Sequence, residues 1–217
     1  MVSIHAQTDP ETTDTIQQKE RYGLRVGLDL SKPIRTLVEK GYSGFEILGD
    51  FRLSKKFYIA GEFGNEKKDR FESNLNSTSK GSYIKVGFDY NAYENWFGMS
   101  NAIHAGLRYG FSTHTQELLS YSIYTTNQDL PPSSRVDPIE FNGLTAHWVE
   151  LILGIKTELL SNLYLSINVQ LKRKISFDQP DNFDNLYVPG FNRTYDESSF
   201  GVGYGYTLSY LIPIFKK

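Results

Sequence analysis

Two short stretches contain the residue types that serine hydrolases use. Ser112 and His114 lie two positions apart, and His147 and Glu150 lie three positions apart. A serine nucleophile, a histidine base and a carboxylate that orients the base form the catalytic triad of many hydrolases. On a β-strand, residues two apart share a face, whereas residues three apart lie on opposite faces. The spacing therefore favours ordinary polar groups at the end of a strand. We predict that the protein is not an enzyme, and a hydrolase is the alternative.

The composition narrows the class of protein. The chain of 217 residues has 23 basic and 25 acidic side chains, so it lacks the basic excess that is typical of nucleic-acid-binding proteins. It contains no cysteine, which excludes disulfides and cysteine zinc ligands. The acidic residues between 178 and 197 match no calcium-loop spacing, so we expect neither a metal nor a cofactor. Aromatic residues make up 14% of the chain, more than a disordered protein carries.

The dominant pattern is an alternation of large apolar side chains with small or charged ones. In one segment, Ile103, Leu107 and Phe111 alternate with His104 and Arg108. A period of two indicates β-strands with two different faces. The pattern occurs in eight segments, which are residues 22–30, 45–53, 57–63, 84–90, 103–111, 149–156, 163–172 and 201–212.

The links between these segments alternate in length. Short links, residues 54–56, 91–96 and 160–162, alternate with long links, residues 31–42, 65–82, 113–143 and 176–199. An even number of strands with short turns at one end and long loops at the other is typical of outer-membrane barrels.

The distribution of charge indicates which face meets lipid. The apolar face carries almost no charge, and the interior of an eight-stranded barrel has little room for eight rows of large apolar side chains. We therefore predict an all-β fold, a closed eight-stranded antiparallel transmembrane β-barrel with short periplasmic turns and long extracellular loops, in the bacterial outer membrane. A soluble, lipocalin-like barrel with its apolar face inside is the alternative.

The opposite face carries charges of both signs, which would point into a narrow lumen. Buried charges must be paired, because an unpaired charge away from water costs several kcal/mol. We predict a charge network that plugs the lumen, and a small channel is the alternative. Its members are Arg25, Asp29, Glu46, Asp50, Arg52, Glu62, Lys85, Asp89, Arg108, Glu150, Lys156 and Lys172.

The long link over residues 113–143 contains an unusual number of large apolar side chains for a loop. Exposed together in water, such side chains promote association. We predict that this loop packs over the barrel mouth or docks against a protein partner, and a lid without a partner is the alternative. The expected partner surface consists of Leu118, Leu119, Tyr121, Ile123 and Tyr124.

The N-terminal residues differ from the rest in composition. Residues 1–6 end in a small residue, Ala6, and are interpreted as the remnant of a signal peptide. Residues 7–20 are polar without periodicity and are predicted to form a disordered periplasmic tail. The predicted barrel spans residues 21–215.

Three stretches resemble a known group of proteins: residues 21–30, residues 105–111 and Pro189-Gly190-Phe191 before the last strand. They resemble the small Bacteroidota outer-membrane β-barrel proteins of unknown function, and the architecture is similar to OmpA/OmpX-type eight-stranded barrels. The resemblance implies a fold and a membrane but no catalytic residues. We expect a structural or interaction component of the cell envelope. Its expected partners are outer-membrane lipid, lipopolysaccharide and other envelope proteins, without nucleic acid; a small channel or a rim-sited outer-membrane hydrolase is the alternative.

Overall fold

Eight long strands form the fold in the computed structural model, which describes residues 21–94, 101–123, 133–181, 183–195 and 197–216. They are β1 (Arg21–Asp29), β2 (Tyr42–Arg52), β3 (Phe57–Phe71), β4 (Leu75–Glu94), β5 (Ala102–Ile123), β7 (Ile139–Leu160), β8 (Leu163–Phe177) and β11 (Phe200–Lys216). The predicted signal-peptide remnant and tail, residues 1–20, lie outside the described residues.

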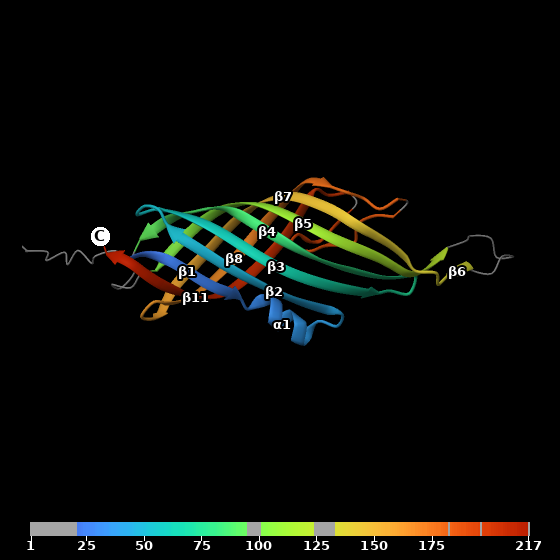
Figure 1. Ribbon diagram of the computed structural model, residues 1–217, viewed down its shortest axis with the longest axis horizontal. Helices are drawn as coiled ribbons and strands as arrows, with labels where there is room; N and C mark the ends of the chain where they lie inside the picture. Colours follow the sequence, from blue (N-terminus) through green and yellow to red (C-terminus); the bar gives the residue numbers. More distant parts are fainter. Residues whose placement is uncertain (1–20, 95–100, 124–132, 182, 196, 217) are drawn as a thin grey trace, which may run out of the picture.

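The sheet closes on itself. Each long strand pairs antiparallel with the next long strand in the chain, and β1 pairs antiparallel with β11. In Figure 1 the strands wind around one long axis as a continuous wall. The predicted closed eight-stranded antiparallel barrel is therefore confirmed.

The seam between the first and last strands contains an irregularity. Arg21 lies opposite Lys216 and Asp29 lies opposite Thr207, but the register shifts between Tyr22 and Gly23. The alternation alone places Tyr22 on the outward face, yet its side chain is only 7% exposed. Tyr22 pairs with Phe215 and Gly23 with Pro213, so the extra residue of this bulge is Ile214 on β11, and the regular alternation that predicts an exposed Tyr22 ends here.

The two faces of the wall have opposite chemistry. On β5, Leu107 and Tyr109 are exposed on the outside, whereas His104 and Arg108 are buried on the inside. The other long strands follow the same rule, because successive side chains of a strand point to opposite faces. The apolar outer wall and the charged interior are thus two consequences of one sequence period.

Two segments that were predicted to be loops are strands instead. Strand β3 continues to Phe71 and β4 begins at Leu75, and the two strands stay paired throughout. The predicted loop over residues 65–82 is therefore mostly a hairpin. Their polar side chains hid this extension, because backbone pairing satisfies N–H and C=O groups whatever the side chains are. A loop there was expected because the apolar alternation stops at about residue 63.

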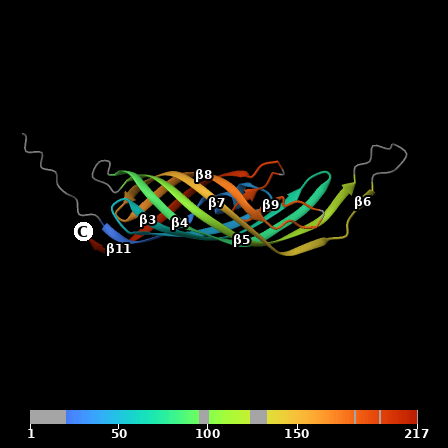
Figure 2. The same cartoon turned by 90° about the horizontal axis from the view of Figure 1, so that it is seen from above.

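The predicted long loop over residues 113–143 is also wrong, because the regular alternation ends at about Phe111 while the backbone pairing continues. β5 extends to Ile123, β7 begins at Ile139, and the short β6 (Ser133–Arg135) pairs with the end of β5. Residues 124–132 lie outside the described residues. Figures 1 and 2 show the β5–β7 hairpin continuing beyond the rest of the barrel toward β6.

A short helix follows β1 at this end of the barrel. In α1 (Ser31–Val38), the backbone N–H and the hydroxyl of Ser31 donate to the carboxylate of Asp29 at 2.9 and 2.8 Å. These bonds satisfy a donor at the helix start, where the backbone N–H groups lack intrahelical partners. The helix lies outside the ring beside β2 (Figure 1). Within the described ranges, no helix has the length and hydropathy to cross a membrane.

Candidate functional site

The middle of the barrel contains a network of acidic and basic side chains from different strands. The Lys85 ammonium on β4 lies 3.1 Å from the Glu46 carboxylate on β2 and also pairs with Glu62 on β3. The Arg108 guanidinium on β5 bridges Glu62 at 3.1 Å and Asp89 at 2.8 Å. Because each cation contacts at least two carboxylates, the network joins β2, β3, β4 and β5 across the interior.

A second group of charges lies toward the short-turn end. Asp50 on β2 accepts from Arg25 on β1 at 3.1 Å and from Lys156 on β7 at 2.9 Å. The Arg25 guanidinium also lies over the ring of Tyr164, 4.6 Å from its centroid. A carboxylate between two cations and a cation over an aromatic face are both stabilising arrangements for buried charge.

The third group is centred on one fully buried carboxylate, Glu66 on β3. Lys32 of α1 lies 2.6 Å from its Oε1, and the hydroxyls of Tyr42 and Tyr187 donate to it at 3.0 and 2.6 Å. The backbone N–H of Gly190 donates to Oε2 at 3.1 Å. Helix α1, strand β2 and the segment between β8 and β11 therefore meet at one side chain.

That segment, residues 178–199, enters the barrel mouth. It contains the short strands β9 (Tyr187–Val188) and β10 (Asn192–Arg193), which pair with each other. Val188 and Phe191 form a buried apolar cluster with Tyr83, Ala146 and Trp148 of the wall. The strongly apolar tip of this otherwise polar segment is thus packed against the inner wall.

Two wall residues, Lys172 and Tyr83, hold the tip in place at Gly190. The Lys172 ammonium donates to the carbonyl of Gly190 at 2.6 Å. Gly190 has a φ of +82°, and a Cβ there would lie 2.6 Å from the Tyr83 ring, so only glycine fits this close approach. The Trp148 indole N–H donates to Glu150 at 2.7 Å, and Glu150 also lies 3.4 Å from Lys172.

The outer part of the same segment is tied to β7. The carboxylate of Asp178 accepts from the hydroxyl and from the backbone N–H of Thr145 at 2.6 and 2.9 Å. These two hydrogen bonds hold the pKa of Asp178 below its ordinary value. The segment is therefore anchored at its beginning as well as at its tip.

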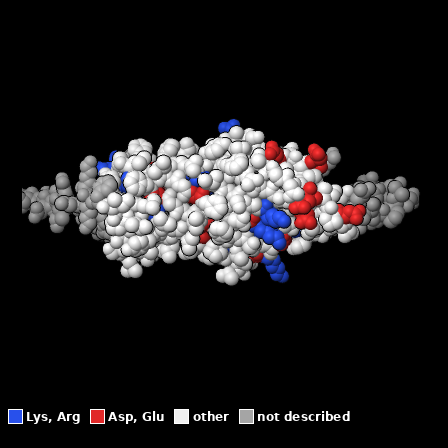
Figure 3. Space-filling view, viewed as in Figure 1, with Lys and Arg blue, Asp and Glu red and all other residues white. Residues whose placement is uncertain are grey.

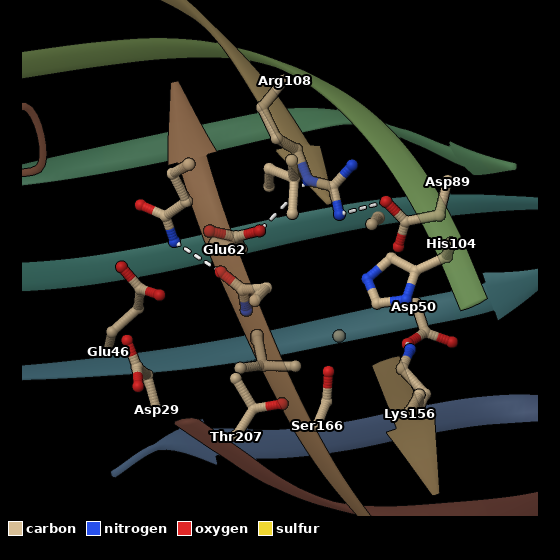
Figure 4. A pocket seen from close by; sticks show the side chains of 16 residues that line it. Asp29, Glu46, Asp50, Glu62, Asp89, His104, Arg108, Lys156, Ser166 and Thr207 are labelled. Carbon is tan, nitrogen blue, oxygen red and sulfur yellow. Dashed lines mark hydrogen bonds and ion pairs between the residues drawn. The ribbon is translucent and has the colours of Figure 1, made fainter. Parts of the chain in front are cut away.

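A small cavity lies among the described residues of the interior, with a volume of about 40 Å³. Figure 4 shows Asp50, Asp89, His104 and Lys156 around it, with Arg108 paired to Asp89. A buried water needs roughly 10–15 Å³ of such volume, so the cavity has room for only a few waters. It is too small for an organic substrate.

Ten of the twelve predicted interior charges are buried. They are Arg25, Asp29, Glu46, Asp50, Lys85, Asp89, Arg108, Glu150, Lys156 and Lys172. Glu62 is nearly buried, and Arg52 lies at the rim, where it donates to the carbonyls of Ser54 and Lys55 at 3.1 and 2.9 Å. Asp29 accepts from Ser31 at the start of α1 and from the backbone N–H of Tyr206 at 3.1 Å, and it joins no ion pair among the described residues.

Sequence reasoning missed Glu66 and Lys32. Glu66 continues the inward row of Glu62 and Gly64, so extending the two-residue period past the last apolar residue would have found it. Lys32 has no such signal, because it lies on a helix whose position depends on the finished barrel. Tyr187 is equally hidden, although the apolar tip beside it is a local hint.

The structure does not bring the candidate hydrolase residues together. Ser112 donates to the carbonyl of Ser82, and His114 contacts Asn185 at 3.4 Å. His147 bonds to Tyr109 on the outer face at 2.7 Å, whereas Glu150 lies inside. Within the described ranges, no group of three or more His, Asp or Glu side chains could hold a metal ion.

The predicted partner surface lies on the β5 extension instead of a loop. Leu118 is buried with only 6% of its surface exposed, and Leu119 and Tyr121 are half-buried. The Ile123 side chain and Tyr124 lie outside the described residues. Leu118 therefore cannot contact a partner directly, while Leu119 and Tyr121 are accessible in part.

Comparison with known proteins assigns the chain to a family. Residues 1–217 match the family described as a domain of unknown function (DUF6048), and the chain belongs to this family. No curated protein matches it. Among solved structures, it is similar to Ail, the attachment invasion locus protein of Yersinia pestis. The identity is 9% and the TM-score 0.42, over 89% of this chain and 99% of that one.

The Glu66 cluster generates a stability prediction. Replacing Glu66 by Gln leaves the buried Lys32 ammonium without its counter-charge, and breaking a buried pair in this way costs about 3–5 kcal/mol. Urea unfolding of the folded barrel should show this loss. The matched control is Glu72→Gln, which removes a carboxylate from an exposed pair with Arg70 and should cost less than about 1 kcal/mol.

A double substitution tests the pairing itself. Lys32→Met combined with Glu66→Gln removes both charges and should recover part of the lost stability, because no buried charge is then left unpaired. Equal losses for Glu66→Gln and Glu72→Gln would contradict a central role for Glu66.

Proposed function

We propose that the protein is an outer-membrane β-barrel with a closed lumen that serves as a structural or interaction component of the cell envelope. One observation carries the proposal. Through the middle of every long strand the outward row is apolar and exposed, while the charged side chains at these levels face inward. In Figure 3 this face of the wall is almost free of exposed charge over much of its length.

The size of the apolar surface supports a lipid environment. The largest exposed apolar patch of a typical soluble protein covers roughly 300–600 Å². Here, large apolar side chains are exposed on all eight long strands, among them Leu28, Ile47, Phe63, Val86, Leu107, Leu153, Val169 and Tyr206. Contact with lipid removes the free-energy cost of exposing these side chains to water. Closed barrels are the only sheets that can span a membrane, because they have no edges. A soluble barrel would need these side chains inside.

The interior supports a closed lumen. Cations and carboxylates pair across the interior at three levels, and the segment with Val188 and Phe191 fills the mouth above them. An ion that crosses the barrel would have to separate buried ion pairs and find space in a cavity of about 40 Å³. These features favour a plugged barrel over a small channel.

The projecting β5–β7 hairpin supports the interaction part of the proposal. Beyond the mouth, Ile139 is 43% exposed and Val136 is 70% exposed. In the strand pairing, both lie close to the half-buried Leu119 and Tyr121. A structural role alone does not require a hairpin of this length with apolar side chains. We therefore assign envelope-protein contacts to this hairpin. The finer expectations, a Bacteroidota source and lipopolysaccharide among the partners, belong to the same proposal.

Membrane residence predicts the effect of a charge on the outer wall. Leu107→Arg should weaken folding into lipid vesicles by about 2–4 kcal/mol, because Leu107 lies in the middle of the apolar face of β5. Denaturant titration of the barrel in vesicles measures this loss. Thr113→Arg, an exposed position on the same face beyond the apolar side chains, is the control and should be nearly neutral. A wild-type protein that stays folded and monomeric in buffer without detergent would contradict the proposal.

The closed lumen predicts an electrical result. The wild-type protein in planar bilayers should give no steady single-channel current, because the ion pairs around Lys85 and Glu150 close the interior. A stable, ion-selective conductance that changes with Lys85→Ala would show that the barrel is a channel.

The hairpin assignment predicts a crosslinking result. Replacing Leu119 and Tyr121 by Ser should abolish crosslinks between the hairpin and envelope proteins in intact cells, without changing the heat-modifiable migration of the folded barrel. Leu53→Ser is the control, because Leu53 is exposed at the opposite end. Crosslinks that persist in the Ser variant would mean that the hairpin is not the contact surface.

A further inference from the structure

Two lysines lie directly opposite each other on the outer wall near α1. Lys67 on β3 and Lys80 on β4 are paired in the register, and both are exposed. Lys67 has one ion pair, with Asp69 at 3.2 Å, while Lys80 has none with any described residue. Like charges directly across a strand pair repel each other. An anion between the two ammonium groups would remove this repulsion.

The lysines lie where the apolar wall ends. Along the outward rows, Phe63 and Ile84 are followed by Asn65 and Ser82, which are joined by a hydrogen bond of 2.9 Å, and then by the lysines. With a rise of about 3.3–3.4 Å per residue, the three levels lie roughly 7 Å apart. The wall is apolar at the first level, neutral and polar at the second, and cationic at the third. This order matches that of the acyl chain, the linkage and the phosphate in a membrane lipid.

An apolar groove adjoins these levels. It has a volume of about 400 Å³, lies between α1 and the outer wall, and is lined by Pro33, Thr36, Leu37, Ser43, Gly44, Phe45 and Asn65. Ser43 is the register partner of Lys67, so the groove and the lysine pair are contiguous. On the helix, Leu37 and Val38 are 86% and 76% exposed. Figure 3 shows basic side chains gathered on this face where the uncharged wall ends.

We infer that this surface binds one anionic phospholipid, with an acyl chain in the groove beside α1 and its negatively charged phosphate between Lys67 and Lys80. The inference rests on the proposed membrane residence, because the groove continues the lipid-facing wall. It explains two otherwise unfavourable features together, the opposed lysines and the apolar side chains that α1 exposes. The same surface without lipid would leave both unsatisfied.

Lipid selectivity in detergent tests the inference. Dioleoyl phosphatidic acid or dioleoyl phosphatidylcholine is titrated into the solubilised barrel, and bound lipid is counted by native mass spectrometry. We expect phosphatidic acid to bind roughly thirtyfold more tightly, since two lysines near an anionic lipid together contribute about 2 kcal/mol. Lys67→Ala with Lys80→Ala should abolish the preference. Lys55→Ala with Lys56→Ala, at two exposed lysines of the opposite end, should retain it.

Two further arms separate the parts of the site. Leu37→Ser should weaken the binding of both lipids by a similar factor, because it alters the groove and not the charges. Leu37 is 86% exposed, so the variant should keep the heat-modifiable migration of the folded barrel. A preference that survives in the Lys67/Lys80 variant would overturn the inference. So would its loss in wild type with millimolar inorganic phosphate, which would indicate a site for a free anion.

The same samples separate this inference from the proposed function. If the wild-type barrel folds into vesicles but binds both lipids equally, only the anionic-phospholipid site is wrong. If it does not fold into vesicles at all, the membrane proposal fails first, and the site fails with it.

Discussion

The need to pair charge inside a narrow closed sheet is the constraint on which this structure depends. Once the large apolar side chains face outward, the interior must accept the polar residues, and water has little room to solvate them. Each buried charge then requires a counter-charge from another strand or, like Asp29, several hydrogen-bond donors. Asp50 shows this directly, because it binds Arg25 on a neighbouring strand and Lys156 on a strand across the barrel. The interior is therefore a set of crosslinks between strands.

Much of this arrangement could be predicted from the sequence because strands have an exact period of two. The alternation around Leu107 and Arg108 specifies which side chain faces the interior, and a closed ring leaves that side chain nowhere else to go. The identity of each partner could not be predicted in the same way. The pairing of Arg108 with both Glu62 and Asp89 depends on the stagger of strands, which the alternation does not encode.

The barrel mouth was harder to predict, for a physical reason. Strand extensions there lose the regular alternation of apolar and polar side chains, so β3 beyond Phe63 and β5 beyond Phe111 look like loops although their backbones remain paired. Glu66 lies in such an extension, and its partners come from a helix and from a segment far along the chain. Such a cluster arises from the tertiary fold, and no local pattern contains it.

The seam between β1 and β11 also has a consequence for the order of events during assembly. The pairing of Arg25 with Leu211 and of Asp29 with Thr207 joins the first strand to the last. Ion pairs that cross the interior, such as Lys156 with Asp50, come within reach only when the sheet has curled enough to bring β2 and β7 face to face. An open sheet therefore has unpaired polar edges and unpaired charges together. Closure of the ring pairs the strand edges and the charges together. A chain that stops before residue 200 therefore cannot form a stable partial barrel, and the last strand to be made completes the pairing of the first strand.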